Sequence, residues 1–217
     1  MDYGTARLNM VESQVRTNKV TDSRVVAALL AVPRERFVPE KLRGVAYVDE
    51  DLPLGGARYL LEPMVLARLL QAAQLKPSHR VLDVGAATGY ATAILARLAA
   101  SVVALEQEPR LADEARRNLH ELMVNNVSVV TGDLAAGNQK SAPYDVILVN
   151  GAIAGVPPAL KAQLAEGGRL ATVIKAGAGM GQATLFTRVG DSLSGRVIFD
   201  AGTPLLPGFV PQESFVF

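Results

Sequence analysis

The sequence lacks cysteine and tryptophan and has only two histidines, and these absences narrow the chemistry that is available to it. Without cysteine, the chain has neither disulfides nor thiolate ligands for a metal ion. The two histidines, His79 and His120, fall in unrelated segments, so a zinc site built on histidine is not expected either. The sequence therefore predicts no metal centre.

An excess of charge of one sign and a long hydrophobic run are also missing. The 22 basic and 21 acidic residues leave a formal net charge of +1, which gives no electrostatic reason to expect nucleic acid or an anionic membrane as a partner. The longest apolar run, residues 25–32, is too short to cross a bilayer, and the N-terminus lacks the apolar core of a signal peptide. We expect a soluble, cytoplasmic protein. Its oligomeric state is left open.

What is present starts with a helical extension over residues 1–76. Helical spacing runs from 10 to 16 and from 22 to 31, where Thr21 or Asp22 can cap the second helix and Pro33 ends it. Residues 33–58 are punctuated by proline and glycine and are expected to be irregular. A further helix is predicted over 63–73, with Pro63 in its first turn.

Strands and helices alternate in the second predicted domain, residues 77–217. Continuous apolar strands are expected at 80–85, 101–106, 127–131, 144–149 and 169–174, with helices at 90–99, 109–123 and 157–164. Residues 183–189 and 196–200 are predicted to form a hairpin. The pattern predicts an α/β, Rossmann-like fold with a mostly parallel seven-stranded sheet ending in an antiparallel hairpin, as in class I methyltransferases.

A candidate cofactor motif, DVGAATGY, follows the first of these strands at residues 83–90. Gly85 and Gly89 suit a tight turn and the close approach of a ligand, and Ala87 takes the place of the middle glycine of a G-x-G-x-G pattern. Taken alone, the motif also fits a structural turn between a strand and a helix. Two acids at the ends of the following strands favour a binding site.

Glu106 ends the second strand, about 20 residues after Gly85, where a carboxylate accepts hydrogen bonds from both ribose hydroxyls. Asp133 follows the third strand, where an acid of methyltransferases meets the adenine amino group. Structural alternatives are a solvated strand-end carboxylate for Glu106 and a Gly-Asp turn for Asp133. All of these residues lie at the carboxyl ends of strands, where open α/β sheets bind ligands.

Asp83 distinguishes S-adenosylmethionine from a dinucleotide. A carboxylate two residues before the first glycine suits the cationic methionyl end of S-adenosylmethionine and would sit badly beside a pyrophosphate. The alternative is a buried acid that caps the loop. The predicted cofactor is S-adenosylmethionine, bound by Asp83, Gly85, Ala87, Gly89, Glu106 and Asp133.

Longer stretches of the chain carry a family resemblance. They are residues 10–16 (MVESQVR), 32–39 (VPRERFVP), 46–47, 51–55 (DLPLG), 80–90, 143–149 and 166–170. These stretches resemble the protein-L-isoaspartate O-methyltransferase family, and VPRERFVP is the specific part. The resemblance implies transfer of a methyl group from S-adenosylmethionine to the α-carboxylate of isoaspartyl residues in a protein or peptide, which starts the repair of damaged protein.

The substrate loop departs from that family. Its pattern, approximately LPIGHGQTISQP, is replaced by LPLGGARYLLEP over residues 52–63, so that the hydroxyl residues fall on Tyr59 and Leu61 and the amide on Glu62. Leucine cannot hydrogen-bond a carboxylate and an ionised glutamate repels one. Arg58 and the Tyr59 hydroxyl can compensate in part. We therefore expect weak or absent isoaspartyl activity.

Three functions follow from these observations. The leading one is an active methyltransferase, on isoaspartyl protein or another acceptor, with Arg58, Tyr59 and Asn150 as candidates beside the methyl group and no assigned catalytic residue. Asn150-Gly151 equally fits a plain turn. The second is a catalytically degenerate S-adenosylmethionine-binding or scaffold protein. A nicotinamide-dependent oxidoreductase is disfavoured by Asp83 and by the terminal hairpin. The role of residues 205–217, which pack on the sheet edge or face a partner, is undecided.

Overall fold

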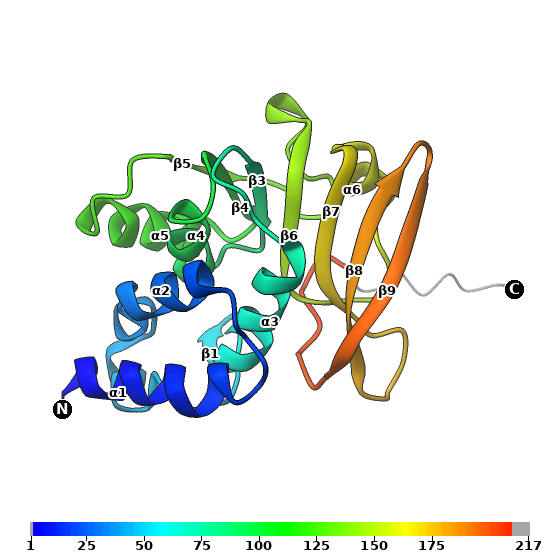
Figure 1. The fold of residues 1–217 in the computed structure, drawn as a ribbon. Helices are drawn as coiled ribbons and strands as arrows, with labels where there is room; N and C mark the ends of the chain where they lie inside the picture. Colours follow the sequence, from blue (N-terminus) through cyan, green and yellow to red (C-terminus); the bar gives the residue numbers. More distant parts are fainter. Residues whose placement is uncertain (1, 210–217) are drawn as a thin grey trace, which may run out of the picture.

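A seven-stranded sheet organises the computed structural model, which describes residues 2–209. The strands lie in the order β5-β4-β3-β6-β7-β8-β9 (Figure 1). Neighbours from β5 to β7 are parallel, and β8 and β9 continue the sheet antiparallel. The predicted fold class is confirmed. The strands are β3 (Arg80–Val84), β4 (Ser101–Glu106), β5 (Val127–Thr131), β6 (Tyr144–Ile153), β7 (Leu164–Ile174), β8 (Gly181–Val189) and β9 (Ser192–Ala201).

Three helices connect the parallel strands: α4 (Tyr90–Ala96), α5 (Pro109–Glu121) and α6 (Pro158–Ala162). Prolines open α5 and α6, as their rigid φ angle favours. Apolar residues at helical spacing on α5, from Leu111 to Leu119, are buried, while its other face carries charges. These helices end two or three residues earlier than predicted. The later strands are longer than predicted.

The N-terminal part differs most from the prediction. Its elements are α1 (Tyr3–Met10), the π-helix η1 (Val11–Arg16), α2 (Ser23–Ala31), the 3₁₀ helices η2 (Arg34–Phe37) and η3 (Glu40–Val45), and α3 (Pro63–Ala73). The first helix starts at Tyr3 rather than near Met10, because Asp2 caps it by accepting from the Gly4 and Thr5 amides. Asp22 caps α2, as predicted.

A short hairpin replaces the irregular structure that was expected before residue 58. It consists of β1 (Leu52–Gly55) and β2 (Arg58–Leu60). Gly55, Gly56 and Ala57 form its turn with φ angles of 90°, 59° and 56°, which is the left-handed region that glycine adopts without strain. Leu52, Leu54 and Leu60 alternate with more exposed residues, so one face of the hairpin packs inward.

Both faces of the sheet are covered, because alternate residues of the central strands enter different apolar clusters. Val81, Val146 and Leu148 pack with α3 and the N-terminal helices, whereas Leu82 and Ile147 pack with Leu160 of α6 and with Leu206 and Phe209. Residues before and after position 76 thus share one core, and the predicted boundary there stays a prediction. Figure 1 shows α1, α2 and α3 grouped on the side that also carries α4 and α5. Residues 210–217 of the C-terminal stretch lie outside the described part.

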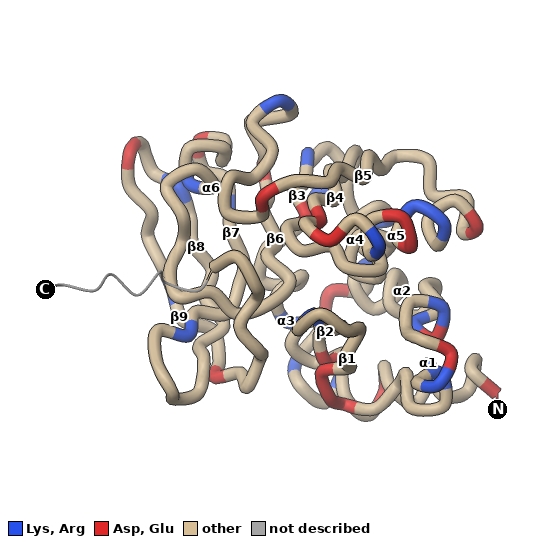
Figure 2. Tube along the Cα trace, turned by 180° about the vertical axis from the view of Figure 1, so that it is seen from behind, with Lys and Arg blue, Asp and Glu red and all other residues tan. Residues whose placement is uncertain are grey.

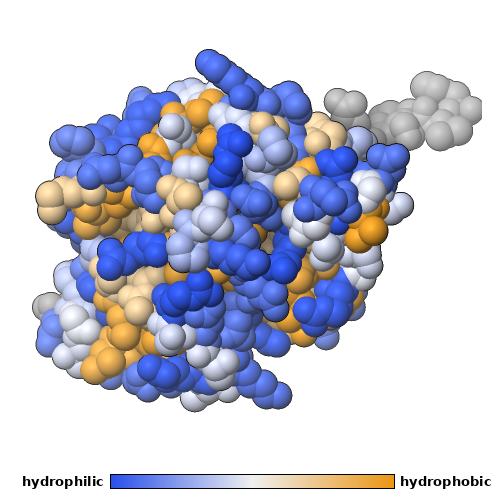
Figure 3. All heavy atoms as spheres, turned by 45° about the horizontal axis from the view of Figure 1, so that its top comes forward, coloured by the Kyte–Doolittle hydropathy of each residue, from blue (hydrophilic) through white to orange (hydrophobic). Residues whose placement is uncertain are grey.

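The surface carries no dominant charge. Acidic and basic positions alternate along the trace, with an acidic stretch, Asp49–Asp51, entering β1 (Figure 2). Apolar atoms on the face seen in Figure 3 lie in separate patches between hydrophilic ones. Within residues 2–209, no helix has the length and apolar character that a membrane crossing requires.

Candidate functional site

The glycine motif forms the loop between β3 and α4. Gly85, Ala87 and Gly89 have φ angles of 76°, 50° and 95°, so Ala87 adopts a backbone conformation that suits glycine better. The Gly85 and Ala86 amides both donate to the carbonyl oxygen of Leu105, at 2.8 and 3.1 Å, which ties the loop to β4. The loop is therefore held directly beside the end of that strand.

Glu106 ends β4 and is fully buried. Its Oε2 accepts from the Ala87 amide at 2.6 Å, and its Oε1 accepts from the Glu108 amide at 3.0 Å. Oε1 also pairs with Nη1 of Arg58. The structure thus places Glu106 against the glycine loop, as the sequence predicted, and the solvated alternative does not apply.

Asp83 lies on β3 with its carboxylate completely buried. Its oxygens accept hydrogen bonds from the Thr92 hydroxyl and from Nδ2 of Asn150. Burial raises the pKa of Asp83 to about 7, although both hydrogen bonds act in the opposite direction. Asn150, expected beside the methyl group, therefore contacts the residue expected at the methionyl end.

Asp133 is less tightly placed. Its carboxylate is exposed and accepts from the Ala135 amide at 2.9 Å, which makes a local turn. The preceding Gly132 amide donates to the carbonyl oxygen of Glu106 at 3.0 Å, so the loop after β5 starts next to the end of β4. The position fits the predicted adenine contact, which stays a prediction.

The loop of residues 52–63 reaches into this region. Arg58 turns its side chain to Glu106 and is only 4% exposed. Tyr59 and Leu61 line narrow gaps beside Asn150. Glu62 precedes α3, and its pKa is raised to about 7 by partial burial and by the nearby charges of Asp51 and Asp49. The repulsion that was expected from Glu62 is thus strongest above neutral pH.

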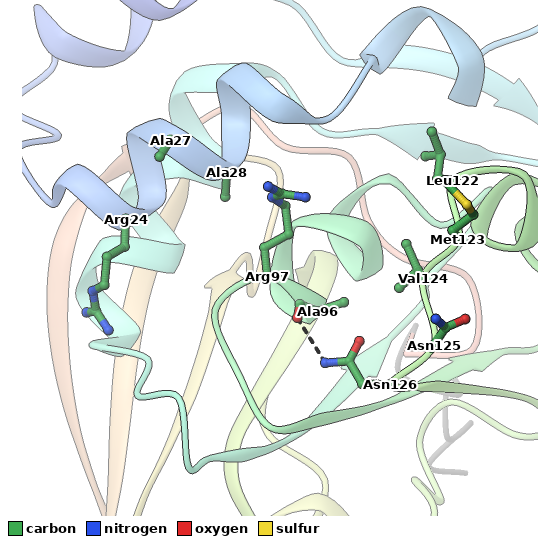
Figure 4. A pocket seen from close by; sticks show the side chains of 10 residues that line it. All are labelled: Arg24, Ala27, Ala28, Ala96, Arg97, Leu122, Met123, Val124, Asn125 and Asn126. Atoms are coloured by element: carbon green, nitrogen blue, oxygen red, sulfur yellow. Dashed lines mark hydrogen bonds between the residues drawn. The ribbon is translucent and has the colours of Figure 1, made fainter.

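Free space at the glycine loop is small. Each of the two gaps that Tyr59, Leu61 and Asn150 line measures about 10 Å³, room for about one water molecule. A much larger hollow, about 500 Å³, lies elsewhere, between α2, the end of α4 and the loop after α5 (Figure 4). Arg24 and Arg97 are among the residues that line it, and Arg24 is paired with Asp22. The buried carboxylates of Asp83 and Glu106 lie at the glycine loop between β3 and α4, which is therefore the candidate site.

Comparisons with known proteins identify the family. The model of the family "Protein-L-isoaspartate(D-aspartate) O-methyltransferase (PCMT)" matches residues 6–199. A protein-L-isoaspartate O-methyltransferase of Koribacter versatilis is 43% identical over 168 residues, which are 77% of this chain and 76% of that protein. Protein-L-isoaspartate O-methyltransferase 2 of Marinobacter nauticus is 41% identical over 191 residues, 88% of this chain and 87% of that protein. The chain belongs to this family.

Solved structures agree with this assignment. A protein-L-isoaspartate O-methyltransferase has a TM-score of 0.82 and 28% identity, with 94% of this chain and 67% of that chain covered. A Plasmodium falciparum protein described as a putative family member, solved with S-adenosyl-L-homocysteine, has a TM-score of 0.79 and 20% identity over 96% and 99% of the two chains. The predicted family, and with it an S-adenosylmethionine-dependent methyltransferase, is confirmed.

The residues of this family member fit the cofactor chemically, although its own side chains fill part of the space. A Cβ added to Gly85 would lie 3.0 Å from Cδ2 of Leu206 and 3.1 Å from Nη2 of Arg58, so both side chains rest on the loop where a ligand would approach. Glu106 offers the carboxylate oxygens that ribose hydroxyls would need, and its contact with the ribose stays a prediction. Across residues 2–209, no three His, Cys, Asp or Glu side chains gather in a way that suits a metal ion.

Arg34 is a residue of this site that the sequence reasoning did not single out. It is completely buried and donates to the carbonyl oxygens of Ala46 and Leu61, at 2.7 and 2.8 Å. Its guanidinium carbon lies 5.0 Å from the centre of the Tyr90 ring, which adds a cation–π contact. Arg34 therefore anchors the loop of residues 52–63, the acceptor loop, to α4. It lies within VPRERFVP, the stretch that carried the resemblance.

Proposed function

We propose that this protein transfers the methyl group of S-adenosylmethionine to the α-carboxylate of isoaspartyl residues in proteins or peptides. One observation carries the proposal: Glu106, buried at the end of β4 against the glycine loop, in a chain whose family model covers residues 6–199. The relatives' names supply the acceptor class. A cytoplasmic location suits such a repair reaction and stays a prediction.

The chain's own residues have few chemical tasks in this reaction. The bound cofactor supplies an electrophilic methyl group, and the acceptor carboxylate is already a nucleophile. Glu106 would hold the ribose by accepting from its hydroxyls, and Asp83, kept in place by Thr92 and Asn150, would offer negative charge to the cationic end. Alignment and exclusion of water then supply the rate enhancement, so no general base is needed.

A second candidate is a member that binds the cofactor but has lost the transfer. Leu61, 3% exposed beside Tyr59 and Asn150, offers no hydrogen bond to an acceptor carboxylate. Arg58, the cation that the sequence offered for the acceptor, is engaged with Glu106. These two observations are what favours the second candidate.

Two measurements on the native protein separate the candidates. Calorimetry with S-adenosylhomocysteine measures the binding of the cofactor product. Transfer of labelled methyl to an isoaspartyl peptide, with the normal aspartyl peptide as control, measures the reaction. Base-labile label on the isoaspartyl peptide alone supports the proposal. Cofactor binding without any label on that peptide contradicts it and supports the binding protein.

A further inference from the structure

The strongest unexplained feature of the site is the buried guanidinium of Arg58. One nitrogen, Nη1, pairs with Glu106, while Nε and Nη2 are buried without a hydrogen-bond partner among the described residues. A guanidinium stays charged in proteins, and leaving its donors unsatisfied in the interior is unfavourable. Arg58 is therefore held by one carboxylate and retains capacity for a second anion.

Arg58 occupies the place that the ribose needs. A carboxylate has about four acceptor positions, and on Glu106 the Ala87 amide, the Glu108 amide and Arg58 already use three. Two ribose hydroxyls cannot be added while Arg58 stays. Nη2 also lies above Gly85, where the cofactor would approach the backbone.

The last described segment closes the same space from the other side. Leu206 packs on Gly85, and a Cβ added to Gly151 would lie 2.8 Å from the Leu206 Cβ. Backbone hydrogen bonds attach the segment to β6, from Ala152 to the Pro204 carbonyl at 2.9 Å and from Leu206 to the Ala152 carbonyl at 2.8 Å. Cofactor binding thus requires movement of Leu206 as well as release of Arg58.

We propose that Arg58 exchanges one anion for another: it pairs with Glu106 until the ribose takes that carboxylate, and then binds the carboxylate of the methyl acceptor. The second half rests on the proposed function. A displaced guanidinium still needs an anion, and the acceptor carboxylate is the anion that the reaction brings. Arg58 is followed directly by Tyr59, which lines the gap next to Asn150. Beside Tyr59, the Arg58 guanidinium provides the hydrogen-bond donors that Leu61 cannot provide.

The exchange predicts opposite effects of one substitution on two ligands. Arg58→Gln removes the competitor of the ribose, so S-adenosylhomocysteine should bind about 10-fold more tightly. It also removes the acceptor's cation, so an isoaspartyl peptide should bind the S-adenosylhomocysteine-saturated protein about 10-fold more weakly. Arg58→Lys keeps the charge without the planar fork, so both of its affinities should lie between those of native protein and Arg58→Gln.

Calorimetry on native protein, Arg58→Gln, Arg58→Lys and Arg110→Gln tests this, after circular dichroism has verified that each variant is folded. Arg110 is the matched control, because it also contacts the hairpin, through the Leu54 carbonyl at 3.1 Å, but pairs with Glu114. Its variant should leave both affinities within about twofold of native.

Unchanged or weaker binding of S-adenosylhomocysteine to Arg58→Gln overturns the exchange. Tighter cofactor binding with unchanged peptide affinity also overturns it, since Arg58 would then only block the site. Neither readout needs turnover. Failure of the proposed function would appear separately, as absent methyl transfer in the presence of Arg58-dependent peptide binding.

Discussion

The cofactor side and the acceptor side of this site are built differently. At the ends of β3 and β4, Asp83 and Glu106 each receive hydrogen bonds from two or more donors of the protein, and for Glu106 the Ala87 amide of the glycine loop is one of them. In the acceptor loop, Leu61 is apolar, Arg58 has two unpaired nitrogens within the described residues, and the pKa of Glu62 is raised to about 7.

The difference indicates which part of this site the protein itself holds in place. Carboxylates held by backbone and neighbouring side chains need no ligand to stay in position, so Asp83 and Glu106 are preorganised. On the acceptor side, two guanidinium nitrogens of Arg58 have no hydrogen-bond partner within the described residues. Variation in acceptor use would then arise from the loop of residues 52–63, while the cofactor side stays constant.

The largest test of this comparison changes the loop alone. We expect the double variant Leu61→Ser/Glu62→Gln to increase isoaspartyl turnover about 100-fold, because a hydroxyl and an amide restore donors whose loss costs about 3 kcal/mol of transition-state binding. Labelled methyl transfer measures kcat/KM. The affinity for S-adenosylhomocysteine should change less than about threefold.

An unchanged kcat/KM in the double variant would refute this prediction and would mean that the loop already serves the carboxylate through other groups. A pH series sharpens it. Because burial raises the pKa of Glu62 to about 7, its charge should lower native activity as the pH rises from 6 to 8. The ratio of Glu62→Gln to native activity should therefore be larger at pH 8 than at pH 6, with the contribution of Asp83 common to both proteins.

A substitution on the cofactor side should have the next largest effect. Glu106→Ala removes a charged acceptor of two ribose hydrogen bonds, worth about 1.5–3 kcal/mol, and should weaken S-adenosylhomocysteine about 10- to 100-fold. Glu108→Ala removes the same charge from an exposed side chain two residues away and serves as control. Equal calorimetric affinities of Glu106→Ala and native protein would remove Glu106 from the site.

Asp83→Asn tests the electrostatic part of the same side. The amide keeps the shape of the carboxylate but not its charge, so the variant should weaken S-adenosylmethionine several-fold more than its neutral-sulfur product. Competition binding with the two ligands measures the ratio. Equal losses would show that Asp83 positions the loop without sensing the cofactor's charge.

The raised pKa of Asp83 gives an independent check on stability. A carboxyl group whose folded pKa is above its unfolded value stabilises the fold fully below the unfolded pKa, near 4, and this contribution is lost as the pH rises through about 7. Asp83→Asn should therefore gain stability relative to native protein between pH 5 and pH 8. Thermal unfolding of both proteins, without cofactor, at these two pH values measures the difference.

Much of the cofactor side could be predicted from the sequence because its determinants are local. Gly85 and Glu106 lie at the ends of apolar strands, and parallel strands bring such ends together. The bounds of β4 and β5 were predicted correctly for the same reason. The helix of Asp2 and the hairpin of residues 52–60 were missed, since their formation depends on one cap and on a three-residue turn.

The partner of Arg58 could not be predicted, because it depends on contact between residues 48 positions apart. Nothing in the spacing of Arg58 indicates that its side chain turns to Glu106 rather than to an acceptor. The packing of Leu206 on Gly85 is hidden in the same way, because a leucine after an irregular stretch has no periodic pattern. Both contacts join residues that are far apart in the sequence, and both bring other parts of the chain against the cofactor side of the site.

The smallest effect concerns the alanine in the glycine motif, and tests how rigid the cofactor side is. Ala87 has a φ angle of 50°, which costs a non-glycine residue about 1 kcal/mol, while glycine costs about as much in chain entropy. Ala87→Gly should therefore change the free energy of unfolding by less than about 1 kcal/mol, a shift of Tm within about 4 °C. Ala86→Gly, at a buried neighbour outside the left-handed region, gains nothing from the backbone and should be about 1 kcal/mol less stable than Ala87→Gly. Equal destabilisation by both substitutions, measured by thermal unfolding, would mean that the loop relaxes around position 87, and the cofactor side would then be less preorganised than its hydrogen bonds indicate.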